Sequence, residues 1–86
     1  MNASTATGIS IRVGVIAELT GPLSFAGIAN ANVARMVVDD INAKGGLLGR
    51  QVDLYIEDGA TTDSVAESKA AKLVEQDKVD VIFGGI

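Results

Sequence analysis

The chain contains five segments in which apolar residues recur with a regular period, and three of these segments predict strands. Residues 9–19 are rich in Ile and Val, and both faces of this run are apolar after Arg12. This pattern is typical of a central parallel strand that is covered on both sides. Residues 52–57 alternate between apolar and polar side chains, which predicts an edge strand with one buried face. Residues 79–83 are almost wholly apolar and predict a third strand.

A segment in which apolar residues recur with the period of a helix separates the first strand from the second. The helix is expected over residues 25–43, after the turn residues Gly21 and Pro22. Ser24 is the expected N-cap, and Gly45 and Gly46 are expected to end the helix because glycine adopts the left-handed conformation at little cost. The expected buried stripe consists of Val33, Val37 and Ile41, flanked by Ala34 and Val38.

A second helix is expected over residues 63–76. Ser64 and Glu67 have the spacing of a capping box, although Asp63 competes as the cap. The expected buried stripe consists of Ala66, Ala70, Leu73 and Val74.

The element order is therefore β-α-β-α-β, which indicates an α/β fold with a parallel sheet. A buried first strand and an edge second strand give the strand order 2-1-3. Right-handed crossovers then place the helices on opposite faces, in a three-layer, flavodoxin-like arrangement. In such sheets ligands bind outside the carboxyl ends of the strands, where the chain reverses direction. The loop at residues 20–27 and the end of the chain at residues 84–86 are the segments expected there.

Composition narrows the functional classes. The 86 residues suffice for one small domain, and a net charge of −4, from 11 acidic and 7 basic residues, argues against a nucleic-acid partner. The sequence has no Cys and no His, and it carries neither a phosphate-binding glycine motif nor a nucleophile elbow. We therefore expect no enzymatic activity and no cofactor.

Three carboxylates near the second strand raise the question of a metal site. Glu57, Asp58 and Asp63 resemble a magnesium-binding cluster at strand ends. Asp63 is better explained as a favourable charge or cap at the start of a helix, so we expect no metal ligands here.

Four strings resemble the type I periplasmic solute-binding proteins of ABC transporters. They are LTGPLSFAG at residues 19–27, DDINAKGGLLGR at 39–50, the acidic pair at 57–58 followed by TDS at 62–64, and AKLV at 71–74. These strings follow in the family's order across residues 9–86. The resemblance is greatest to the binders of branched-chain amino acids, urea and short amides, and residues 77–85 lean slightly towards the urea and amide branch.

The resemblance implies that residues 9–86 form the N-terminal half of the first lobe of a longer, two-lobed periplasmic receptor. Such a receptor traps a small polar solute between its lobes and delivers it to a membrane permease. Residues 1–8 are small, polar and uncharged, so they are interpreted as a flexible leader without a signal peptide.

The resemblance also suggests which residues would contact the solute. In the first loop these are Ser24, Phe25 and Ala26, and after the third strand they are Gly84, Gly85 and Ile86. Four of them have a simpler explanation: Ser24 as a helix cap, Phe25 as a packing aromatic, and the two glycines as sites of close backbone approach. Ala26 occupies a place that is often tyrosine in the family.

A different kind of function stays open. The chain could be a minimal flavodoxin-like structural unit without a ligand, which self-associates. The apolar strand at residues 79–83 carries only Asp80 to discourage pairing, so we expect self-association, with a two-fold homodimer as the favoured form. The two chains could pair these strands or exchange a helix.

Overall fold

The computed structural model describes residues 9–84 and confirms the predicted order of elements. The chain forms β1 (Ile11–Ala17), α1 (Ser24–Ala43), β2 (Val52–Asp58), α2 (Asp63–Glu75) and β3 (Val81–Gly84). The leader predicted at residues 1–8, and the proposed site residues Gly85 and Ile86, lie outside the described residues.

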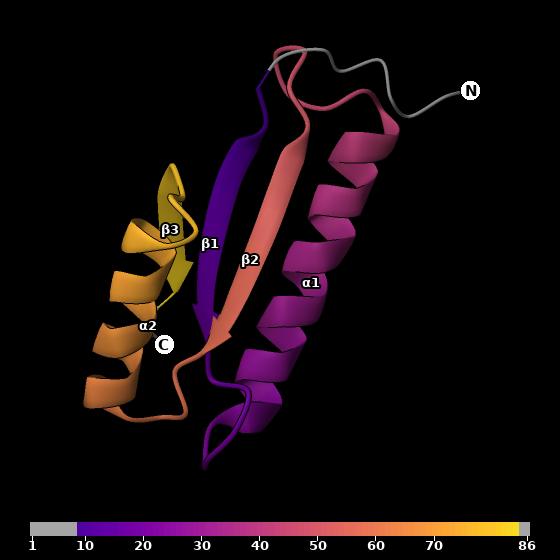
Figure 1. Ribbon diagram of the computed structural model, residues 1–86. Coiled ribbons are helices and arrows are strands. Elements are labelled where there is room, and N and C mark those ends of the chain that lie inside the picture. The colour runs from indigo at the N-terminus through magenta and orange to yellow at the C-terminus, as the bar shows by residue number, and fades with distance from the viewer. Residues whose placement is uncertain (1–8, 85–86) are drawn as a thin grey trace.

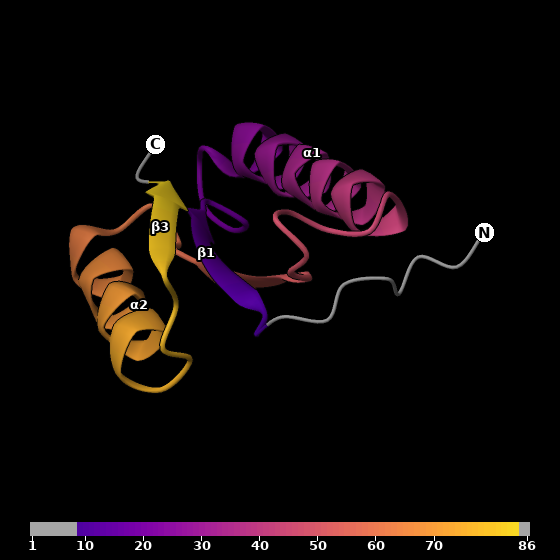
Figure 2. The same cartoon turned by 90° about the horizontal axis from the view of Figure 1, so that it is seen from above.

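The three strands form a parallel sheet in the order β2-β1-β3, as predicted. β1 lies in the centre, where Ile11 pairs with Val52 at one end of β2 and Ala17 pairs with Asp58 at the other. The two helices lie on opposite faces of this sheet (Figures 1 and 2). The molecule therefore has the three layers expected from right-handed crossovers.

Two strands are shorter or shifted relative to the prediction. β1 spans seven residues rather than residues 9–19, and Ile9 before it is 83% exposed. β3 begins at Val81 rather than at residue 79, because Val79 still donates its amide to Leu73 O of α2. Asp80 joins β3 to β1, since its amide donates to Arg12 O at 2.7 Å and its carboxylate accepts from Arg12 N at 2.8 Å.

Helix α1 packs through a different stripe from the one predicted. Gly27 and Ala31 are buried against the sheet, whereas Val33 and Val37 are about half exposed. Small residues let the helix backbone approach the strands closely, and at Gly27 a Cβ atom would lie only 2.0 Å from Glu18 O. The stripe therefore follows the smallest side chains, while the larger valines lie on its flank. Ala34, Val38 and Ile41 are half-buried, as expected.

The predicted helix caps are correct at one end only. Ser24 is the first residue of α1, Leu23 occupies the N-cap position, and no side chain caps this end. Thr62 precedes α2, again without a side-chain cap, so neither Asp63 nor Ser64 has that role. The C-terminal prediction is confirmed: Gly45 and Gly46 have positive φ, and their amides bond to Asn42 O and Ile41 O in the pattern of a Schellman motif.

Helix α2 covers the other face of the sheet with a narrow stripe. Leu73 is fully buried, and Ala66 and Ala70 are half-buried, as predicted. Val74, which the pattern also predicts to be buried, is 57% exposed. In residues 9–84 neither helix has the length and apolar character that crossing a bilayer requires.

Candidate functional site

The carboxyl ends of the strands bring the two predicted site segments to one edge of the sheet. β1 leads into the loop before α1, and its Ile16 pairs with Gly84 of β3. A Cβ atom on Gly84 would lie 2.1 Å from Ile16 O, so the two backbones are in close contact here. The structure therefore places the start of α1 and the end of β3 beside the same strand end.

The first predicted group, Ser24, Phe25 and Ala26, forms the first turn of α1. Ser24 and Ala26 are half-buried, and Phe25 is 77% exposed. Phe25 is therefore not a core aromatic within the described residues. Of the second predicted group the structure describes only Gly84, which is exposed and has a φ of 131°.

Asp58 ties the loop after β1 to the loop after β2. Its Oδ1 accepts from Leu19 N at 2.9 Å, from Thr20 N at 3.3 Å and from Ala60 N at 2.7 Å. Its Oδ2 accepts from the Thr20 hydroxyl at 2.7 Å. These bonds favour the ionised carboxylate, with the Thr20 hydroxyl contributing most, and they hold the pKa of Asp58 below its ordinary value against the opposing effect of burial.

A second carboxylate joins the same two loops. Glu18 is 6% exposed, and its Oε2 accepts a hydrogen bond from Thr61 N. The Thr61 hydroxyl returns a bond to Thr20 O at 3.1 Å. We call Asp58, Glu18, Thr20 and Thr61 together the loop clamp.

Close packing supports the loop clamp. A Cβ atom on Gly59 would lie 2.8 Å from a Glu18 carboxylate oxygen, and one on Gly21 would lie 2.7 Å from the Thr61 hydroxyl. Ala60 and Thr61 both have φ near +50°, a strained conformation that surrounding contacts must hold in place. The hydrogen bonds of the loop clamp supply such contacts.

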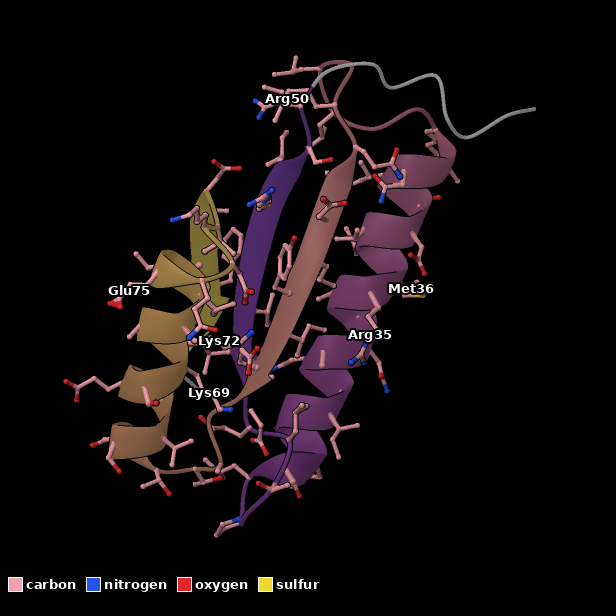
Figure 3. All side chains as sticks on the ribbon, viewed as in Figure 1. Arg35, Met36, Arg50, Lys69, Lys72 and Glu75 are labelled. Atoms are coloured by element: carbon pink, nitrogen blue, oxygen red, sulfur yellow. The ribbon has the colours of Figure 1, made fainter. Side chains whose placement is uncertain are left out.

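The three carboxylates considered as metal ligands do not converge. Glu57 points to the α2 face, where its carboxylate lies 2.6 Å from Lys72 Nζ and 3.5 Å from Lys69 Nζ. Figure 3 shows both lysines on the side of α2 nearer the sheet, with Glu75 on the opposite side. Asp58 belongs to the loop clamp, and Asp63 lies in the first turn of α2. Within residues 9–84 no three acidic side chains are grouped to hold a metal ion.

An apolar cavity of about 420 Å³ lies between α1 and the sheet, on the side towards β3. Val15, Val37 and Phe83 are among its apolar residues, while Glu18, Gly27, Asn30 and Gly84 also line it. The predicted residues Ser24, Phe25 and Ala26 do not line it.

The pattern of residues along the chain does not reveal the loop clamp or Asn30. The pattern indicates Asp58 as a candidate metal ligand and as part of a family string, and Glu18 as part of the first strand, but it connects neither residue to the neighbouring loop. An acidic residue at the end of each of two adjacent parallel strands, followed by threonines in both loops, is the signal that could have revealed the clamp.

Comparison with known proteins identifies the family. Residues 10–86 match the family model described as periplasmic binding protein. The Leu/Ile/Val-binding protein BraC3 of Rhizobium johnstonii is 44% identical over 64 residues, which cover 74% of this chain and 17% of the relative. The Leu/Ile/Val-binding protein homolog 7 of Brucella abortus is 34% identical over 74 residues, covering 86% of this chain and 18% of the relative.

Solved structures agree with this comparison. The branched-chain amino acid transporter substrate binding protein LivJ of Streptococcus pneumoniae, in complex with isoleucine, matches with a TM-score of 0.85 and 34% identity, over 88% of this chain and 22% of that chain. A fatty acid ABC transporter substrate-binding protein of Thermomonospora curvata shares the fold, with a TM-score of 0.80 and 23% identity over 92% of this chain and 20% of that chain.

These relatives are binding proteins rather than enzymes, in agreement with the expectation of no catalytic role. The 86-residue chain spans about a fifth of the length of the relatives it matches. The matched family model, the parallel sheet in the order 2-1-3 and the sequence identity all lead to one assignment. The chain belongs to the periplasmic binding protein family.

Proposed function

We propose that the protein containing this chain is a periplasmic receptor that binds a small amino acid and presents it to an ABC transporter permease. The observation that carries the proposal is the match of residues 10–86 to the periplasmic binding protein family. Its relatives in Rhizobium and Brucella are Leu/Ile/Val-binding proteins, so branched-chain amino acids are the first solutes to test, ahead of urea and short amides.

The proposed contact surface is the carboxyl edge of the sheet. Ser24, Phe25 and Ala26 would contribute from the first turn of α1, and Gly84, Gly85 and Ile86 from the end of β3. Two observations support this placement. Ile16 pairs with Gly84 beside the loop that leads to α1, and the Phe25 ring is 77% exposed at that edge. An exposed aromatic ring can cover the aliphatic part of a solute and exclude water from it.

Isothermal titration calorimetry of the full-length protein tests the proposal. Isoleucine, leucine, valine, urea and acetamide form the panel, and we expect binding of at least one amino acid without chemical change to it. Phe25→Ala is expected to weaken that binding. Met36→Ala is the matched control, because Met36 is 65% exposed on α1 and lies away from this first turn. Turnover of a bound amide, or equal affinities in the Phe25 variant and the control, would contradict the proposal.

The 86-residue chain alone is expected to bind these solutes very weakly. Solute held at one edge of a single sheet stays in contact with water, and hydrogen bonds exposed to water contribute little to affinity. The same titration with the isolated chain measures this difference, and micromolar binding would show that the chain forms a sufficient site by itself.

Self-association is the second candidate, and one observation favours it. β3 pairs with β1 along one edge, and within residues 9–84 no strand pairs with its other edge. Its Val81 and Phe83 side chains are 40% and 60% exposed. An unpaired apolar strand edge offers N–H and C=O groups to a second chain. Sedimentation equilibrium of the isolated chain at micromolar concentration tests this candidate, with a two-fold dimer expected and a cooperatively folded monomer as the contrary result.

A further inference from the structure

The Asp58 side chain makes most of its hydrogen bonds to a loop from another strand. Asp58 is the last residue of β2 and pairs with Ala17, the last residue of β1. From this position its carboxylate accepts from Leu19 N, Thr20 N and the Thr20 hydroxyl, and from Ala60 N in its own loop. A register shift of one residue would move this side chain to the other face of the sheet. The bonds therefore depend on the observed pairing.

A short, hydrogen-bonded segment connects Thr20 to the first turn of α1. Ser24 N donates to Gly21 O at 3.1 Å, and Gly27 N donates to Leu23 O at 3.1 Å. Pro22 has a fixed φ, which removes one of the variable torsion angles between Thr20 and Ser24. The position of the first turn of α1 therefore depends on the position of Thr20.

Glu18 and Thr61 hold the same loop from a second side. Thr61 N donates to Glu18, and the Thr61 hydroxyl donates to Thr20 O. The backbone pairing of β1 with β2 extends from Ile11 to Ala17 and does not need the Asp58 carboxylate. Removal of that carboxylate should therefore loosen the loop while the sheet stays intact.

We infer that Asp58 is a positioning residue for solute binding, because its carboxylate fixes the loop that orients the first turn of α1 towards the solute. The inference rests on the proposed function, in which Ser24, Phe25 and Ala26 touch the solute and Asp58 does not. A loop that is already ordered pays less conformational entropy on binding than one that is ordered by the solute.

The kinetic consequence distinguishes positioning from direct contact. When only a fraction of molecules has the loop in place, the apparent dissociation constant rises by the inverse of that fraction. Association then slows, whereas dissociation from the correctly formed complex is unchanged. Loss of a direct contact would instead act chiefly on the dissociation rate.

The experiment compares variants of the full-length protein in binding kinetics with isoleucine and in amide hydrogen exchange. Asp58→Ala removes all four accepted bonds, and Thr20→Val removes only the hydroxyl donor. Asp58→Asn keeps an oxygen that can accept from Leu19 N and Ala60 N. Asp39→Asn is the matched control, because Asp39 is exposed in the later half of α1.

We expect Asp58→Ala to raise the Kd about three- to tenfold through slower association, with faster exchange of the Leu19 and Thr20 amides. Thr20→Val should have a smaller effect in the same direction, Asp58→Asn should recover most of the affinity, and Asp39→Asn should match the wild type. An unchanged Kd in Asp58→Ala despite faster exchange, or a loss confined to the dissociation rate, would overturn the inference. Failure of the wild type to bind any solute of the panel would overturn the proposed function, and this inference with it.

Discussion

Leu73 of α2 lies directly over Gly14 of β1. A Cβ atom on Gly14 would lie 3.1 Å and 3.2 Å from the two Leu73 methyl carbons, and Leu73 is 0% exposed. The glycine makes room for the leucine, which lets α2 pack closely against the central strand. Leu73 is the residue of α2 that is fully buried.

Leu73→Ala is therefore expected to lower the free energy of unfolding by about 2–5 kcal/mol, because it removes buried methyl groups and leaves a cavity. Val74→Ala, one residue further along the same helix, should change it by less than about 0.5 kcal/mol, since Val74 is 57% exposed. Urea denaturation of the 86-residue chain measures both values. Equal effects of the two substitutions would show that α2 does not pack as described.

Gly27→Ala is expected to destabilise the protein although Ala is the better helix former. Helix propensity alone would favour Ala by about 1 kcal/mol. The new Cβ atom would lie 2.0 Å from Glu18 O, a backbone atom that cannot move aside without displacing α1 or β1. We expect a net loss of about 1–3 kcal/mol in urea denaturation. An unchanged or raised stability would show that α1 does not approach β1 so closely.

Stability should fall at acid pH in a way that depends on Asp58. The Thr20 hydroxyl and three backbone amides lower the pKa of Asp58 below its ordinary value of 3.8. The contribution of Asp58 to folding stability is therefore complete above about pH 3.8. It is lost as the pH falls through the lower pKa of the folded state. Asp58→Asn should flatten this acid decline in chemical denaturation, and Asp39→Asn should leave it unchanged. The same decline in both variants would assign it to other carboxylates.

At alkaline pH, the stability of the protein should depend on Lys72. Its ammonium donates hydrogen bonds to Asp77, which has the larger effect, and to Glu57. Both bonds raise the pKa of Lys72 above the ordinary value of 10.5. The contribution of Lys72 to folding stability is present in full below about pH 10.5. It is lost as the pH rises through the higher pKa of the folded state. Lys72→Met should remove this alkaline decline in denaturation experiments, whereas Asp58→Asn should retain it. A decline that persists in the Met variant would contradict this assignment.

If the isolated chain self-associates through β3, the exposed apolar side chains of that strand should control it. Phe83→Glu would place a charge at the apolar edge, where Phe83 is 60% exposed. We expect this change to weaken dimerisation at least about tenfold in sedimentation equilibrium. Met36→Glu, on the 65% exposed surface of α1, is the control and should leave the association unchanged. Equal weakening by both changes would place the interface elsewhere.

The sequence by itself determined the order of elements and the strand order of the sheet. Apolar residues on both faces of β1 and on one face of β2 distinguish a central strand from an edge strand, and the handedness of crossovers then fixes which face each helix covers. Gly45 and Gly46 also marked the end of α1 correctly, because few residues other than glycine adopt positive φ at low cost. The family resemblance likewise could be read from short strings, most of which span turns, whereas AKLV at residues 71–74 lies within α2.

Only the tertiary structure decided the packing of α1 and the contacts at the carboxyl edge. The pattern favoured Val33 and Val37 as the buried stripe, but Gly27 and Ala31 are buried, because the distance between helix and sheet selects for small side chains. The loop clamp joins Asp58 to Thr20, which are 38 residues apart in sequence. The sequence around neither residue indicates that the two are bonded. Such pairs follow from strand register and loop geometry, which arise only when the three strands come together.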